Sequence, residues 1–249
     1  MLEIKNLKKS FDGVRAVNDF SLSLQEGKIT SIIGPNGAGK TTVFNIITGL
    51  LQADGGDIRL GKATIINLPS WKIALSGISR TFQDMRLFKK MTVQENVLLA
   101  RQHQGGEQLL NAMFVYSPNS VEHKHHKEKV MALLEFVGLS EKRNDHAENL
   151  SYGQQKLLTI ACCLSAEPSL ILLDEPVAGV QPAMIEKITT ILNQLIEKEK
   201  KTILLIEHNI DVVTDISDTI VVMDDGTKIA EGTAKDIQDN SEILEAYLS

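Results

Sequence analysis

Runs of mostly apolar residues mark several buried strands in the chain. Residues 29–33, 170–173 and 202–206 are rich in Ile and Leu and show no strict polar alternation. Such runs are typical of parallel strands that are covered on both faces. Residues 220–223 form a similar run before a turn at 224–226. The pattern therefore predicts a parallel sheet built from segments that lie far apart in the sequence.

The N-terminal part has a different pattern, which predicts antiparallel strands. Residues 2–7 and 14–17 are predicted strands, and Asp12-Gly13 between them is a strong hairpin signal. Residues 20–24 alternate apolar and polar side chains and predict a further half-buried strand that turns at 26–27. Short strands are expected at 58–60 and 64–66, a helix at 71–75, and a strand at 77–83 that ends in Gln83.

Residues 84 to about 165 are predicted to be mainly helical. Thr92 and Glu95 have the spacing of a capping box, which begins a helix. Apolar residues at helical spacing over 130–137 predict an amphipathic helix that Gly138 can end. Residues 102–120 are expected to be loops around a short helix at 109–115, and a last helix is expected at 243–248.

Composition narrows the class of protein. The 249 residues suit one large domain or a core with a subdomain. The net charge is −6, so the chain does not have the excess of basic residues that is typical of a nucleic-acid binder. No apolar run approaches the ~20 residues that span a bilayer. The first residues lack the apolar core of a signal peptide. We therefore expect a cytosolic protein whose link to a membrane would come through a partner.

Two groups of cysteine or histidine residues could suggest a metal site, but an ordinary structural role explains each group better. Cys162 and Cys163 are adjacent, which suits neither a disulfide framework nor a metal site, so they are expected to pack within a helix. His123, His125 and His126 stand among lysines without a carboxylate or cysteine cluster, which favours a solvated helix face over a metal site.

Residues 34–41 carry the clearest chemical motif. They read Gly-Pro-Asn-Gly-Ala-Gly-Lys-Thr and match the P-loop pattern G-x-x-x-x-G-K-[ST]. The strand predicted at 29–33 precedes them, and apolar residues at helical spacing over 43–50 predict a helix that begins near Thr41. A glycine loop that opens a helix presents backbone N–H groups to an anion. The segment is therefore predicted to bind phosphate.

A second helix start and several strand ends add chemistry. Ser151 and Gln154 form a capping-box pair that opens a helix, a second anion-seeking end. Asp174 and Glu175 follow a buried strand, where parallel sheets place ligands, so Asp174 can hold Mg²⁺ and Glu175 can polarise water. His208 follows the strand at 202–206 and can bind a phosphate or orient water.

The order of these motifs resembles the ATP-binding subunit of ABC transporters over essentially the whole chain. The P-loop at 34–41, Gln83, the signature at 150–154, the acids at 174–175 and His208 carry the resemblance. The resemblance implies an α/β P-loop ATPase of ABC type with a mixed-sheet catalytic lobe and an antiparallel N-terminal part. It implies one ATP-binding domain over 1–249, with the catalytic lobe at 1–83 and 166–249 and an inserted helical subdomain at about 84–165.

The resemblance also assigns roles to individual residues. Glu175, His208 and Gln83 would be catalytic, and Thr41, Gln83 and Asp174 would hold Mg²⁺. Ser151, Gly153 and Gln154 would cap the ATP of a partner subunit. Lys40 would grip the β- and γ-phosphates. The ATP-binding residues would be Phe11, Val17, Gly34, Pro35, Asn36, Gly37, Ala38, Gly39, Lys40, Thr41 and Thr42. From the residues alone, Phe11 could equally be a core aromatic or a stacking surface for adenine.

Several stretches look like the ATPase of branched-chain amino-acid importers. They are residues 80–83, 86–88, 152–155, 207–209, 230–233 and 245–248. The expected partners are a second ATPase subunit, permease subunits and, indirectly, a substrate-binding protein outside the membrane, with no nucleic acid. The expected location is the cytoplasmic face of the cell membrane, and the expected cofactors are ATP and Mg²⁺.

The chain departs from the family pattern in three places. Tyr152 replaces a glycine of the general signature, Cys162 stands where an arginine is common, and Val180-Gln181 replaces the usual Leu-Asn or Leu-Asp. In the family, the loop that contains the last change helps the two ATPase subunits of a dimer to communicate. The change therefore puts the strength of that coupling in question. Other ABC systems, such as those for lipopolysaccharide export or for urea or other amino-acid uptake, and a non-transport ABC ATPase remain alternatives. A non-hydrolysing module is disfavoured by the presence of Lys40, Asp174, Glu175 and His208 together.

Overall fold

The computed structural model describes residues 1–101 and 121–239, which form two units. The first unit contains residues 1–83 and 169–239, and the second contains residues 84–101 and 121–168. The helices predicted at 109–115 and 243–248 lie outside the described residues.

An antiparallel sheet of four strands opens the first unit, as the N-terminal pattern predicts. Its order is β2-β1-β4-β5, and a hairpin at Asp12-Gly13 joins the first two strands. The prediction of separate strands at 14–17 and 20–24 is wrong, because one strand covers 14–23. Irregular register between β1 and β2, with Asp19 at a φ of 60°, lets the chain bend without ending the strand. The strands are β1 (Leu2–Phe11), β2 (Val14–Ser23), β4 (Gly55–Leu60) and β5 (Ala63–Thr64).

The predicted parallel sheet forms the centre of the first unit. Six strands lie in the order β10-β9-β3-β8-β7-β6, and all neighbouring pairs are parallel except β10 with β9. Every residue of β3, β7 and β8 is buried, which explains why their sequences are mostly apolar. The strands are β3 (Ile29–Ile33), β6 (Ile78–Arg80), β7 (Leu170–Asp174), β8 (Thr202–Ile206), β9 (Thr219–Asp224) and β10 (Thr227–Gly232).

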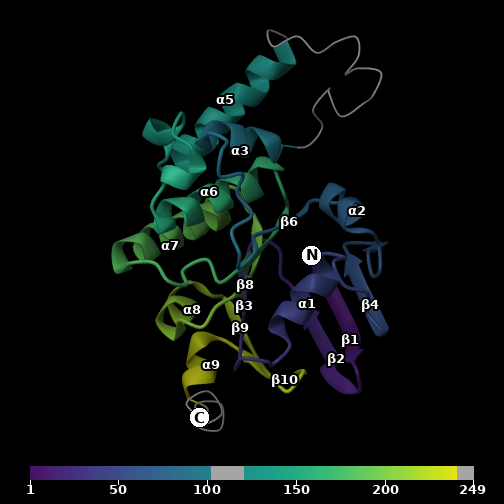
Figure 1. Ribbon diagram of the computed structural model, residues 1–249. Helices are drawn as coiled ribbons and strands as arrows, with labels where there is room; N and C mark the ends of the chain where they lie inside the picture. The colour runs from purple at the N-terminus through teal and green to yellow at the C-terminus, as the bar shows by residue number, and fades with distance from the viewer. Residues whose placement is uncertain (102–120, 240–249) are drawn as a thin grey trace. The chain divides into compact units, whose positions relative to one another are not determined.

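Helix α1 links the two sheets of the first unit (Figure 1). Its Phe44 and Ile47 belong to one buried cluster with Ile4 of β1 and Leu204 of β8. Burial of this apolar surface stabilises the unit and fixes the start of α1 beside the end of β3. The helices of this unit are α1 (Lys40–Ile47), α2 (Ser70–Leu75), α7 (Pro182–Glu197), α8 (Ile210–Ile216) and α9 (Ala234–Gln238).

Strand β6 also differs from the sequence prediction, and β10, α7, α8 and α9 are missing from it. Strand β6 ends at Arg80, so Gln83 lies three residues beyond the strand and not at its end. Helix α7 is missing from the prediction, although its sequence contains the signal. Pro182 occupies a favourable first position, and Ile188, Ile191, Leu192 and Leu195 recur at helical spacing on its buried side.

The second unit is helical, as predicted. Its helices α3, α5 and α6 pack against one another. Thr92 with Glu95 caps α3, Ser151 with Gln154 caps α6, and Gly138 follows the end of α5 at a φ of 70°, so all three predicted boundaries are confirmed. Its elements are α3 (Val93–Leu99), α5 (Val121–Phe136), η2 (Ser140–Lys142), η3 (Ala147–Asn149) and α6 (Tyr152–Ser165).

The two cysteines lie within α6 as free thiols. Burial raises the pKa of the Cys162 thiol to about 12, so this thiol stays protonated near neutral pH. Their predicted helical location is confirmed. Among the helices that the structure describes, none combines the length and the apolar character needed to cross a membrane.

Candidate active site

The predicted phosphate loop runs from the end of β3 to the start of α1. A side chain at Gly34 would place its Cβ 2.0 Å from the carbonyl oxygen of Met223, and one at Gly39 would place it 2.2 Å from that of Ala16. Both contacts are far too short for any residue with a Cβ. Gly39 also cannot cap α1 with a side chain, because it has none. The loop is thus held tightly by its neighbours while the first N–H groups of α1 remain available to an anion.

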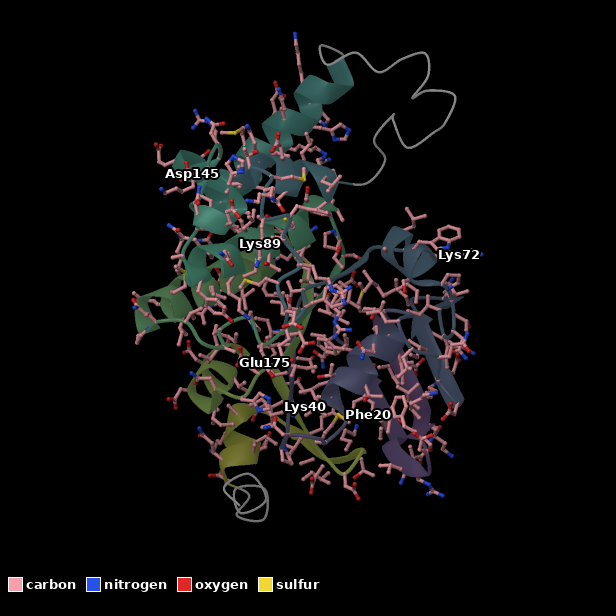
Figure 2. All side chains as sticks on the ribbon, in the orientation of Figure 1. Phe20, Lys40, Lys72, Lys89, Asp145 and Glu175 are labelled. Atoms are coloured by element: carbon pink, nitrogen blue, oxygen red, sulfur yellow. The ribbon has the colours of Figure 1, made fainter. Side chains whose placement is uncertain are left out.

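Lys40 is the first residue of α1 and is 6% exposed. Its ammonium group donates to the carbonyl oxygens of Gly34 at 2.6 Å and Pro35 at 2.8 Å. Burial lowers the pKa of Lys40, and the charges of Glu175 and Asp174 act in the opposite direction. Figure 2 labels Lys40 and Glu175, which belong to this group of charges. The loop therefore carries a desolvated cation close to two carboxylates.

Parallel strand ends bring the acidic residues to the same edge of the sheet. Asp174 is the last residue of β7 and is 3% exposed. Its Oδ2 accepts a hydrogen bond from Arg80 at 2.7 Å, and its backbone N–H donates to the hydroxyl of Thr81 at 3.1 Å. Arg80 ends β6, the neighbour of β7 in the sheet, and Thr81 follows it directly. Asp174 is consequently held at its side chain and at its backbone.

Glu175 contacts the two other residues that are predicted to be catalytic, Gln83 and His208. Gln83 Nε2 donates to Glu175 Oε2 at 3.2 Å, and His208 Nε2 lies 3.2 Å from Glu175 Oε1. Glu175 has a φ of 50°, which a residue with a side chain adopts only at some cost. Its N–H donates to the carbonyl oxygen of Ile206 at 2.9 Å, and this bond to β8 holds the unusual conformation.

Two charged residues beside this edge are missing from the site that the sequence predicts. Arg80 is one, and Glu207 is the other. Glu207 is 2% exposed and accepts backbone N–H groups from Val177 at 2.8 Å and from His208 at 3.0 Å. Burial raises the pKa of Glu207, although these donors act against the shift. The signal in the sequence is a glutamate directly after a buried strand, next to the candidate histidine.

Phe11 ends β1 and is 43% exposed, so it is not a core aromatic. Lys9 Nζ lies 5.4 Å from its ring centroid. Val17, which is predicted to contact ATP, is instead 1% exposed and belongs to the core of the first unit. An exposed ring at the hairpin suits a stacking surface, whereas the side chain of Val17 is almost wholly covered.

The second unit presents the predicted signature at the start of α6. Ser151 Oγ accepts from the N–H of Gln154 at 3.3 Å, and Gln154 Oε1 accepts from the N–H of Ser151 at 2.9 Å. Tyr152, which replaces the expected glycine, is 48% exposed. Ser151 and Tyr152 at the start of α6 are thus exposed, and Tyr152 is the one that differs from the family pattern.

The first unit thus joins a P-loop and a lysine to acids at neighbouring strand ends, which is the arrangement of P-loop ATPases. The sequence model of the ABC transporter family matches residues 17–178. The chain belongs to the ABC transporter family. The ABC family's activity, ATP hydrolysis coupled to transport, is accordingly the activity of this chain.

Known ABC proteins match the chain over nearly its full length. The high-affinity branched-chain amino acid transport ATP-binding protein BraF of Pseudomonas aeruginosa is 42% identical, with 100% of this chain and 97% of the relative covered. A crystal structure of a nucleotide-free ATP-binding cassette from an ABC transporter is 36% identical with a TM-score of 0.87, covering 100% and 99% of the two chains. A dimeric, post-hydrolysis cassette bound to ADP and phosphate is 27% identical with a TM-score of 0.78, covering 94% and 99%.

Proposed function

We propose that this chain is the ATP-hydrolysing subunit of an importer of branched-chain amino acids. The observation that carries the proposal is the grouping of Gln83, Glu175 and His208 beside the P-loop lysine. The relative from Pseudomonas aeruginosa, named for branched-chain amino acid transport, supports the cargo. The subunit would lie at the cytoplasmic face of the membrane, attached through permease subunits that a binding protein supplies with substrate.

The first unit would bind and hydrolyse ATP. Backbone N–H groups of the loop at 34–41 and the ammonium of Lys40 would hold the phosphates, and the exposed ring of Phe11 would stack on the base. Glu175 would align and polarise the attacking water, while His208 and Gln83 hold its carboxylate from both sides. Catalysis of this kind depends mainly on positioning and on stabilisation of charge.

The donors at the site fit Mg²⁺, which prefers oxygen ligands. Asp174 supplies a buried carboxylate, Thr41 a hydroxyl and Gln83 an amide oxygen. Arg80 binds Oδ2 of Asp174, which leaves Oδ1 as its oxygen for a cation. These residues would hold Mg²⁺, and the chemistry that the ion would supply is neutralisation of part of the phosphate charge.

The second unit would act on a different nucleotide. Ser151, Gly153 and Gln154 open α6, where the N–H groups and the helix dipole favour an anion. A related cassette is dimeric with ADP and phosphate bound, which supports a dimer in which each signature covers the ATP of the other copy. Contacts to the γ-phosphate that exist only in the dimer would then favour closure, and hydrolysis would reverse it. The division into a catalytic lobe and a helical subdomain is part of this proposal.

Two variants test the catalytic assignment. Glu175→Gln should bind ATP normally and lose hydrolysis by about 10²–10⁴-fold, because the base that aligns water is gone. It should also accumulate ATP-bound dimer, which size-exclusion chromatography with light scattering would detect. Glu186→Gln is the control, because Glu186 is an exposed residue of α7 and loses the same charge. Hydrolysis by Glu175→Gln at the level of the control would refute the role of Glu175.

A second measurement tests the loop and the cargo separately. Lys40→Ala should lose nucleotide affinity in calorimetry, and unchanged binding would refute the phosphate-binding assignment.

The cargo is tested by purifying the chain with its membrane partners, reconstituting the complex in vesicles and measuring uptake of leucine, urea and a non-branched amino acid. Leucine uptake that requires ATP supports the proposal; selective transport of another compound would show that the chain powers a different ABC system.

A further inference from the structure

Arg80 is a buried charge to which the sequence analysis assigns no role in the site. Its side chain is 4% exposed, and that of its partner Asp174 is 3% exposed. The guanidinium carbon lies 5.3 Å from the ring centroid of Phe44 and 5.0 Å from that of Phe82. Two aromatic rings thus flank the cation and restrict where it can lie.

Hydrogen bonds tie the same guanidinium to two further elements. Nη2 donates to Asp174 Oδ2 at 2.7 Å, at the end of β7, while Nη1 donates to Asn45 Oδ1 at 2.7 Å, within α1. The hydroxyl of Thr48, also beside α1, lies 3.4 Å from Nη1. One planar group from β6 therefore bridges the helix that follows the P-loop to the strand that ends in Asp174. Lysine, with a single flexible ammonium, cannot reproduce this fork.

A buried ion pair of this kind is weak evidence for a stabilising role. Removal of two charges from water costs free energy that their attraction often fails to recover, so apolar residues of similar volume are frequently as stabilising. What the pair does provide is a fixed direction for Asp174. Arg80 binds one carboxylate oxygen, Oδ2, and Thr81 accepts from the backbone N–H of the same residue. The carboxylate cannot rotate without breaking a buried, charge-assisted bond.

We propose that Arg80 is a positioning residue that sets the affinity of the Asp174 site for the divalent cation of the bound nucleotide. It engages Oδ2 and keeps Oδ1 as the ligand oxygen, so the cation meets a preorganised donor. The guanidinium also lies over the ring of Phe82. Phe82 directly precedes Gln83, whose side chain donates to Glu175, so the restraint extends toward this second part of the site. Arg80 has this role only if Asp174 ligates the cation as proposed above.

The test is a Mg²⁺ titration of nucleotide binding in the full chain. Binding of a fluorescent ATP analogue is measured in EDTA and over a range of Mg²⁺ concentrations. Arg80→Met should raise the Mg²⁺ concentration for half-maximal effect by about 10–100-fold, as loss of an outer partner of a metal ligand does elsewhere. Affinity in EDTA should be unchanged, because the proposed role of Arg80 acts through Asp174 and the cation. Arg80→Lys should require a Mg²⁺ concentration between those of the wild type and of Arg80→Met. It also keeps the test available if the Met variant does not fold.

A matched control and a double-mutant cycle separate positioning from folding. Arg59→Met removes an arginine that pairs with Asp57 at 2.6 Å on the surface, where its side chain is 53% exposed, and it should leave the titration unchanged. In an Asp174→Asn background, Arg80→Met should cause no further shift, because its effect passes through Asp174.

The outcomes are distinguishable. If Arg80→Met or Arg80→Lys lowers the melting temperature but leaves the Mg²⁺ titration at the wild-type value, Arg80 is only structural and the inference is refuted. Independent shifts from Arg80→Met and Asp174→Asn would also overturn it. If Asp174→Asn itself leaves the titration unchanged, the metal assignment under the proposed function fails instead.

Discussion

Gly39→Ala should destabilise the protein well beyond the ordinary effect of placing alanine at a glycine. Gly39 has a φ of 95°, and a Cβ there would lie 2.2 Å from the carbonyl oxygen of Ala16 on β2. A carbon–oxygen contact is normally about 3.3 Å or longer, so backbone must move by roughly 1 Å. The oxygen is part of a strand and cannot turn away as a flexible side chain could.

Two costs add at this position. A left-handed backbone costs alanine about 1–2 kcal/mol, and overpacking of a tight contact costs about 1–3 kcal/mol more. The total of about 2–5 kcal/mol corresponds to a fall in melting temperature of roughly 4–20 °C for a chain of this size. Thermal unfolding followed by circular dichroism measures this fall, and calorimetry should show weaker ATP binding because the loop before α1 is displaced.

Gly13→Ala isolates the close contact from the backbone strain. Gly13 has a φ of 89°, nearly that of Gly39, but no atom lies within 4 Å of the position that a Cβ would take there. Only the strain of about 1–2 kcal/mol applies, so the melting temperature should fall by roughly 2–8 °C. Equal falls for the two variants would refute the reasoning that the approach of Ala16, and not the dihedral angle, is what requires glycine at position 39.

Two further predictions concern the second unit. Ser151→Ala should lower stability by about 1 kcal/mol, because the N–H of Gln154 loses its cap, while Ser151→Asp should retain it; chemical denaturation compares the two, and equal stability of both with the wild type would contradict the capping role. Glu167→Gln should lower the melting temperature at pH 7, because bonds from Lys129 and Arg101 lower the pKa of Glu167 from 4.5 to about 2. A lowered pKa stabilises the fold above pH 4.5 and loses that effect as the pH falls toward 2, so the difference from wild type should shrink over this range, and a constant difference would contradict it.

The sequence alone identified features whose causes lie within one short segment. The P-loop needs eight consecutive residues, the caps of α3 and α6 need residues three apart, and the buried strands need a short run of mostly apolar residues. Each of these depends on local hydrogen bonding or on the side that a segment buries, and both leave a pattern in adjacent residues. The helix at 182–197 is missing from the prediction although its apolar residues recur at helical spacing, and an interrupted pattern at 14–23 led to two predicted strands where the structure has one.

Only the tertiary structure decided which distant residues share a site. Arg80 and Asp174 are 94 positions apart, and Gln83 and Glu175 are 92 apart. They meet because β6 lies beside β7, and strand order depends on the packing of the whole sheet, which no local pattern reports. The same holds for Gly39, where the close approach of a carbonyl of β2 adds to the need for glycine that the loop's own φ creates. A motif names the residues that can bind phosphate, whereas the fold determines which groups hold them in place.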